Sequence, residues 1–245
     1  MGILPLAAAL VSAAFSISLI RQFIERHKPH QLAWGVAMAT FAAASLSASL
    51  GMMAGWNPAL FRSYYLFGAV VNVPILALGT LYLYLPRRLG HAAAMGVVAA
   101  SVAGAFAVFN AGLQTSLNGF AGAIPAGSEV MAPAVRALSR YYSYAGFVIV
   151  VAGAVWSTLR LYRRPGIGFR RLAQGNALIA LGTVVVALGS AFARHGRGTI
   201  FAVGLATGVT VMFMGFLRTR TGPPASEPKS GAEPAGDPLS RRAAG

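Results

Sequence analysis

The sequence predicts an all-α, polytopic integral membrane protein, folded as a bundle of seven transmembrane helices. Of its 245 residues 56% are hydrophobic and only 10% are charged, and the mean hydropathy is +0.65. Soluble domains carry about 25% charged residues. The apolar residues also fall into runs of roughly 20, the length that a helix needs to cross the hydrocarbon core. Composition and run length together therefore place the chain in a membrane.

Seven apolar segments qualify as spanning helices, over residues 3–23, 31–54, 61–85, 91–112, 137–160, 170–193 and 198–217. The first resembles a signal peptide in length, but it has no preceding positive region, and its basic residues follow the apolar run instead. We expect it to be retained as a helix. The chain then divides into a transmembrane domain, 1–218, and a cytoplasmic tail, 219–245, whose Pro, Gly and Ala content predicts disorder.

The basic residues predict the orientation of the bundle. They gather in RQFIERHKPH, PRRLGH, RLYRRPGIGFRR and RTRTG, which all fall on one side. By the positive-inside rule this side is cytoplasmic, so the N-terminus is outside and the C-terminus is cytoplasmic. The same rule explains the formal net charge of +15 without nucleic acid as a partner. Because Arg far outnumbers Lys, and Ala and Gly are abundant, we expect a bacterial inner membrane.

The positions of the acidic residues exclude several functions. All five fall in loops or the tail: Glu25, Glu129, Glu227, Glu233 and Asp237. Proton relays, cation-coupled carriers and paired-carboxylate hydrolases rely on carboxylates inside the membrane. A retinal pigment needs a lysine within a late helix, and the membrane segments contain none. Cysteine is absent too, which excludes disulfides and thiolate sites. We therefore predict no catalytic residue and expect that the protein is not an enzyme.

Three of the four histidines, His27, His30 and His91, fall near the cytoplasmic face. Imidazoles on one side of a bundle could ligate a metal or a haem. However, HKPH is a turn between basic residues, with neither a thiolate nor a second carboxylate nearby, so a solvated loop is the favoured interpretation. We predict no metal site and no cofactor, and keep a membrane cofactor protein as the third functional hypothesis.

The segment FRSYYLFGAVVNVPILALGTLYLYLPRR, 61–88, carries Asn72 and Pro74 near its middle. Pro74 has no N–H, so the carbonyl of Val70 loses its helical partner and the helix should bend there. Asn72 is costly in lipid unless it is paired, so it should face protein or water. Interrupted helices near the midplane often form transporter sites. Kinks also occur in bundles that transport nothing, so both interpretations stay open.

The segment 170–193 carries a small, polar stripe. Gly175, Gly182 and Gly189 recur every seven residues, and so do Asn176, Thr183 and Ser190. Seven residues make nearly two helical turns, so the stripe follows one face. Close helix packing is the favoured interpretation, and a ligand pathway is the alternative. The other amides that could converge on an internal site are Asn110, Gln114 and Gln174. The candidate ligand-binding residues are Asn72, Pro74, Asn110, Asn176 and Thr183.

Two loops could recognise partners. RLYRRPGIGFRR holds Arg160, Arg163, Arg164, Arg170 and Arg171, a candidate site for anionic lipid headgroups. The positive-inside rule explains these arginines equally well. The long outer loop, 113–136, is expected to hold a short interfacial segment that caps the bundle. That loop and Trp56-Asn57 are the surfaces we expect to be open to an external partner.

Three functions remain open at this point. The first is permease-like or channel-like handling of a neutral or anionic small molecule or a lipid, without ion coupling through carboxylates. The second is a non-catalytic membrane subunit or assembly factor, with a membrane protein or a second copy of the chain as its partner. The third is the cofactor protein. The lipid bilayer, with its anionic lipids, is the partner that the composition itself implies.

Overall fold

The computed structural model describes residues 2–120, 122–163, 167–193 and 198–220, which are all-helical apart from turns and loops. The uninterrupted spanning helices are α1 (Ile3–Arg26), α2 (Pro29–Ala54), α5 (Arg87–Asn110), α7 (Pro133–Tyr162), α8 (Ile167–Ala193) and α9 (Gly198–Arg220). The remaining span consists of α3 (Pro58–Tyr65), the π-helical turn η1 (Leu66–Val71) and α4 (Asn72–Tyr84). In the described part of the chain seven helices are long and apolar enough to cross a membrane, which confirms the predicted multi-pass bundle. Helix α9 continues just into the predicted tail, and the rest of the tail lies outside the described residues.

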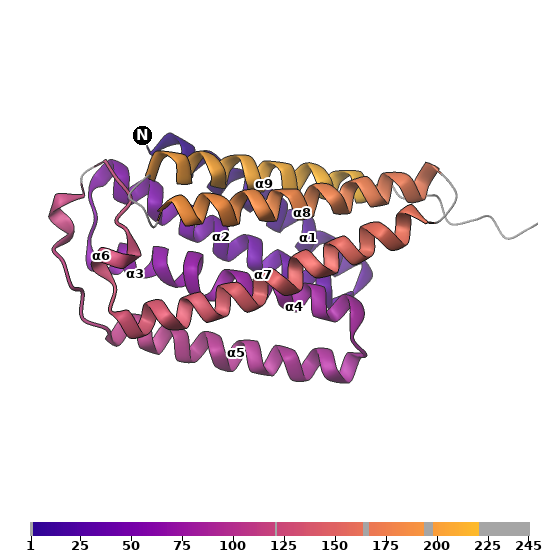
Figure 1. Cartoon of the computed structure of the whole chain (residues 1–245), viewed down its shortest axis with the longest axis horizontal. Coiled ribbons are helices and arrows are strands. Elements are labelled where there is room, and N and C mark those ends of the chain that lie inside the picture. The colour runs from indigo at the N-terminus through magenta and orange to yellow at the C-terminus, as the bar shows by residue number, and fades with distance from the viewer. Residues whose placement is uncertain (1, 121, 164–166, 194–197, 221–245) are drawn as a thin grey trace, which may run out of the picture.

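The two ends of the bundle differ in what they carry (Figure 1). One end holds the N-terminus, α3 and the loop over 111–132, which includes η2 (Leu117–Gly119) and α6 (Gly127–Val130). We call it the loop end. The other holds the α1–α2, α4–α5 and α7–α8 connections, with Arg26, Lys28, Arg88 and Arg163. We call it the basic end, and the positive-inside rule predicts that it faces the cytoplasm.

Six of the spans close a ring around the bundle axis. Helix α1 contacts α2, α2 contacts α4, α4 contacts α7, α7 contacts α8, α8 contacts α9, and α9 returns to α1. Helix α5 lies outside this ring, against α4 and α7, along the lower edge of Figure 1. Most of the α5 surface is therefore left for lipid, since only 11% of the most apolar 18-residue stretch of this helix is buried.

The glycines of the stripe on α8 pack against α9. A Cβ on Gly182 would lie 2.5 Å from the carbonyl oxygen of Gly208, and one on Gly175 would lie 2.8 Å from that of Gly215. These backbones approach so closely because glycine stands opposite glycine on the two helices. Close helix packing, the favoured interpretation of the stripe, is thus confirmed for its glycines.

The interruption expected at Pro74 takes the form of the π-helical turn that precedes it. In a π-helix each N–H reaches the carbonyl five residues earlier, so the N–H missing from Pro74 corresponds to Ala69 in that register. Ser143 of α7 donates its hydroxyl to the Ala69 carbonyl at 3.1 Å. Asn72 donates to the carbonyl of Ala37 on α2 at 2.7 Å. The irregular turn is therefore tied to both neighbouring helices.

The loop end is closed by side chains from the 111–132 loop. Leu117, Val130 and Met131 are buried in one cluster with Trp56 and residues of the α3–α4 span. The indole of Trp56 donates to the carbonyl of Ala123 at 2.7 Å. The expected capping segment is thus present, but the expectation that Trp56 is open to a partner is wrong, because the loop covers it and leaves it 7% exposed.

Candidate functional site

A cavity of about 340 Å³ lies within the six-helix ring and opens at the basic end. Its lining changes character with depth. The rim holds the exposed Arg26, Lys28 and Tyr84 with the half-buried His30. Amides and hydroxyls form a polar belt below it: Gln22, Gln31, Thr80, Ser157, Asn176 and Thr219. The floor is mostly apolar: Phe15, Leu19, Met38, Leu76, Val150, Ile179, Met212 and Phe216.

Helical periodicity produces these layers. On α1 the lining residues are Phe15, Leu19, Gln22 and Arg26, at spacings of four, three and four that keep them on one face. This face changes from aromatic to charged over about 16 Å, at a rise of 1.5 Å per residue. Helix α9 follows the same order, from Met212 on the floor to a threonine in the belt. The cavity therefore has a charged rim and an apolar floor.

Two pairs of polar side chains cross the belt between helices. Gln31 Nε2 of α2 donates to Gln22 Oε1 of α1 at 3.1 Å, and Asn176 Nδ2 of α8 donates to Ser157 Oγ of α7 at 2.7 Å. Gln31 is only 5% exposed, and its Oε1 has no hydrogen-bond partner among the described residues. A buried oxygen without a partner is costly unless a ligand or water serves it.

Aromatic side chains fix the helix contacts beside the cavity. The indole of Trp34 donates to the carbonyl of Leu76 at 3.1 Å, across the α2–α4 contact. Gly79 permits this, because a Cβ there would overlap the indole ring. The Tyr84 hydroxyl donates to the carbonyl of Gly153 on α7 at 2.6 Å. Helix α4, which forms this wall of the cavity, is thus hydrogen-bonded to α2 on one side and to α7 on the other.

The structure brings the predicted ligand-binding residues only partly together. Asn176 lines the cavity. Asn72 and Thr183 lie just beyond its floor: Asn72 binds the residue before Met38, and the Thr183 hydroxyl donates to the Ile179 carbonyl at 2.8 Å.

The other two predicted residues lie elsewhere. Pro74 is in the α4 wall, two residues before Leu76. Asn110 ends α5, outside the ring, and donates to the carbonyl of Phe106 on its own helix at 2.8 Å. The sequence could not anticipate this separation, because it does not say which helix leaves the ring.

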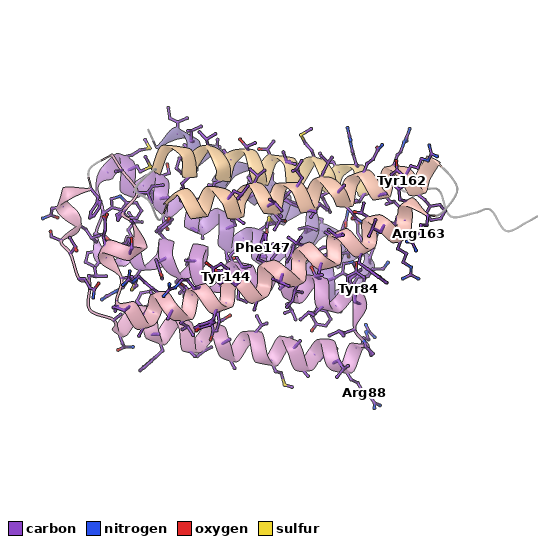
Figure 2. The ribbon with its side chains drawn as sticks, in the orientation of Figure 1. Tyr84, Arg88, Tyr144, Phe147, Tyr162 and Arg163 are labelled. Carbon is purple, nitrogen blue, oxygen red and sulfur yellow. The ribbon has the colours of Figure 1, made fainter. Side chains whose placement is uncertain are left out.

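The predicted headgroup arginines lie at the basic end. Arg160, Arg163, Arg170 and Arg171 are exposed there, while Arg164 lies outside the described residues. Figure 2 shows Arg163 beside Tyr162 where α7 ends, and Arg88 where α5 begins. Their interaction with anionic lipids stays a prediction.

The three cytoplasmic-side histidines have different neighbours. The Tyr82 hydroxyl lies 3.0 Å from His91 Nδ1, and His30 meets the ring of Trp34 edge-on at 5.3 Å between centroids. His27 begins the turn after α1 with a φ of 51°. Within the described ranges no three His, Asp or Glu side chains are placed to hold a metal ion. This arrangement gives the cofactor hypothesis no support, and the absence of a cofactor stays a prediction.

Most of the polar residues that shape the cavity were not predicted as site residues, among them Gln22, Gln31, Arg26 and Lys28. A signal was available, because Gln22 and Gln31 are amides on either side of the HKPH turn, inside two helices that this turn forces to be antiparallel neighbours. No protein-family model matches the chain, and comparisons with curated proteins and with solved structures give no match. Function is therefore argued from the cavity.

Proposed function

We propose that this protein binds a small molecule or a lipid in the ring cavity and handles it as a permease-like membrane protein. The main observation in support is a cavity of about 340 Å³ whose polar groups converge from six helices. Ligand sites are typically concave, largely apolar and provided with a few placed polar groups, over volumes of about 300–1,000 Å³. The cavity has all three properties.

The difference between the two ends supports passage rather than mere storage. The cavity opens at the basic end, and the buried 111–132 loop cluster fills the loop end. Access from one side only is the arrangement expected of a carrier in one of its two states. Among the described lining residues there is no Asp or Glu, which agrees with transport that is not coupled to ions through a carboxylate.

A cavity-filling variant tests the proposal. Ala154 of α7 lines the cavity, whereas Ala152 on the same helix is exposed on its outer surface. Native mass spectrometry of protein purified in mild detergent should show a bound molecule of defined mass on the wild type and on Ala152→Phe, but not on Ala154→Phe. A wild-type protein that carries nothing, or an Ala154→Phe variant that keeps its ligand, would contradict the proposal.

A subunit or assembly role is the second candidate function. It is favoured by the outer face of α5, where Met95, Val98, Val102 and Phe106 are 61–72% exposed. Lipid covers such a face in a bilayer, and a partner helix would cover it equally well. The same spectra separate the candidates, because a stoichiometric second polypeptide with no bound small molecule supports the subunit role.

We propose a bacterial inner membrane as the location, with the basic end in the cytoplasm. The chain lacks cysteine, so single cysteines report accessibility without background. In intact cells a membrane-impermeant maleimide should label Asn118→Cys in the 111–132 loop but not Arg88→Cys at the basic end. Lysis should make Arg88→Cys reactive. Labelling of Arg88→Cys alone in intact cells would show that the orientation is reversed.

A further inference from the structure

The mouth of the cavity carries a net positive charge: Arg26 and Lys28 outnumber the one acidic residue beside them, Glu25. Arg26 and Lys28 are exposed at the rim, and His30 lies beside them. Among the described residues that line the cavity, none is acidic. A ligand that enters here therefore meets an attractive potential if it is anionic, and the apolar walls strengthen that potential by excluding water.

The belt contains a hydrogen-bond acceptor that no described residue uses. Gln31 is buried to more than nine-tenths, and its Oε1 has no partner in the described part of the chain. Its Nε2 is already engaged with Gln22 Oε1 at 3.1 Å. The oxygen itself is fully covered, so a ligand reaches it once the Gln31 side chain turns toward the cavity, below the charged rim. A hydroxyl or amide N–H next to the anionic group would satisfy it.

The floor suits a hydrocarbon chain. Its residues are aliphatic or aromatic, and the ring of Phe15 packs on Phe213 and Phe216 at centroid distances of 5.2 and 4.8 Å. A sugar or an inorganic anion would leave this surface without favourable contacts, whereas each methylene of a hydrocarbon chain gains from burial there. The depth from Arg26 to Phe15, about 16 Å by helical rise, is enough for an extended chain below a headgroup.

We infer that the ligand is an anionic amphiphile with one hydrocarbon chain, of the lysophospholipid type. Its acidic headgroup lies at Arg26 and Lys28, its hydroxyl or amide donates to Gln31, and its chain lies on the floor between α1 and α9. This inference rests on the proposed function, since it names the class of molecule that the ring cavity takes.

Binding of three probes to the full chain in detergent tests the inference. The probes are myristoyl lysophosphatidylglycerol, myristoyl lysophosphatidylcholine, and glycerophosphate. The first should bind about tenfold or more tightly than the second, because both have the same chain and only the first has net negative charge. Glycerophosphate lacks the chain and should bind more than about a hundredfold more weakly than the first.

Charge variants at one end of the bundle provide the matched control. Arg26→Gln/Lys28→Gln should weaken the binding of the anionic lysolipid about tenfold or more, because it removes two of the charges that attract the headgroup. Arg87→Gln/Arg88→Gln removes the same charge from the basic end, but outside the lining, and should change binding by less than about twofold if only the rim acts.

The possible outcomes separate the inference from the proposed function. Equal binding of both lysolipids, or equal loss in both charge variants, overturns the anionic headgroup. Glycerophosphate that binds as tightly as the anionic lysolipid overturns the hydrocarbon chain and identifies a soluble anion. In each case Ala154→Phe still abolishes binding, and the proposed function survives. If Ala154→Phe binds every probe as the wild type does, the cavity is not the site and both proposals fail.

Discussion

Substitutions in the Gln22–Gln31 pair test whether its unpaired oxygen lowers stability and whether the pair contributes to ligand binding. Gln31 Oε1 is buried without a partner among the described residues, and the pair shares one hydrogen bond of 3.1 Å. A net hydrogen bond contributes about 0.5–1.5 kcal/mol, whereas an orphaned buried polar group costs about 1–3 kcal/mol. Methionine has nearly the length of glutamine but neither donates nor accepts strongly. The pair can therefore be made apolar one residue at a time.

The expected order of stability follows from which groups lose their partners. Gln22→Met leaves the whole Gln31 amide unpaired and should lower the free energy of unfolding by about 1–2 kcal/mol. Gln31→Met removes the orphaned oxygen but deprives Gln22 Oε1 of its donor, so the two effects should cancel to within about 1 kcal/mol. The double variant removes every orphan and should be as stable as the wild type or more stable by about 1 kcal/mol.

The assay is denaturation by SDS titration in mixed micelles, followed by tryptophan fluorescence, with ligand binding measured on the same variants. The double variant should combine unchanged or increased stability with a loss of ligand binding of about tenfold or more. A double variant less stable than the wild type by more than about 1 kcal/mol would refute the reasoning, because the pair would then be part of a satisfied structural network.

Three further predictions concern the frame of the bundle; the first two are checked by thermal unfolding in detergent and the third by amide hydrogen exchange. Asn72→Leu loses two hydrogen bonds to α2, of 2.7 and 3.3 Å, and should destabilise the protein by about 1 kcal/mol. Gly79→Ala places a methyl group against Trp34 and should cost about 1–3 kcal/mol, whereas Gly96→Ala on the lipid side of α5 meets open space and should cost nothing measurable. Trp56→Phe removes the indole N–H that donates to the carbonyl of Ala123, and it should raise amide hydrogen exchange throughout the 111–132 loop.

The sequence determined the membrane class, the seven spans and the basic end, because these depend on local composition. A run of apolar residues is a spanning helix wherever it packs, and lipid requires every backbone group to be bonded within the helix. The packing role of the α8 glycines was also predictable from the sequence, since a seven-residue spacing places them on one face of the helix. The interruption near Pro74 was predicted from a missing N–H. Its π-helical form was not predicted, nor was the bond from Ser143 of another helix to the Ala69 carbonyl within it.

Only the tertiary structure decided which polar residues share a site. Asn110 and Asn176 looked alike in the sequence, yet α5 lies outside the ring and α8 within it. Asn72 donates to the backbone of α2. Gln31, next to a turn that was predicted to be a solvated loop, is buried at the cavity, and its Oε1 has no partner among the described residues. Composition fixes whether a helix enters the bilayer, but the contacts between non-adjacent helices, α9 with α1 above all, decide what the ring encloses.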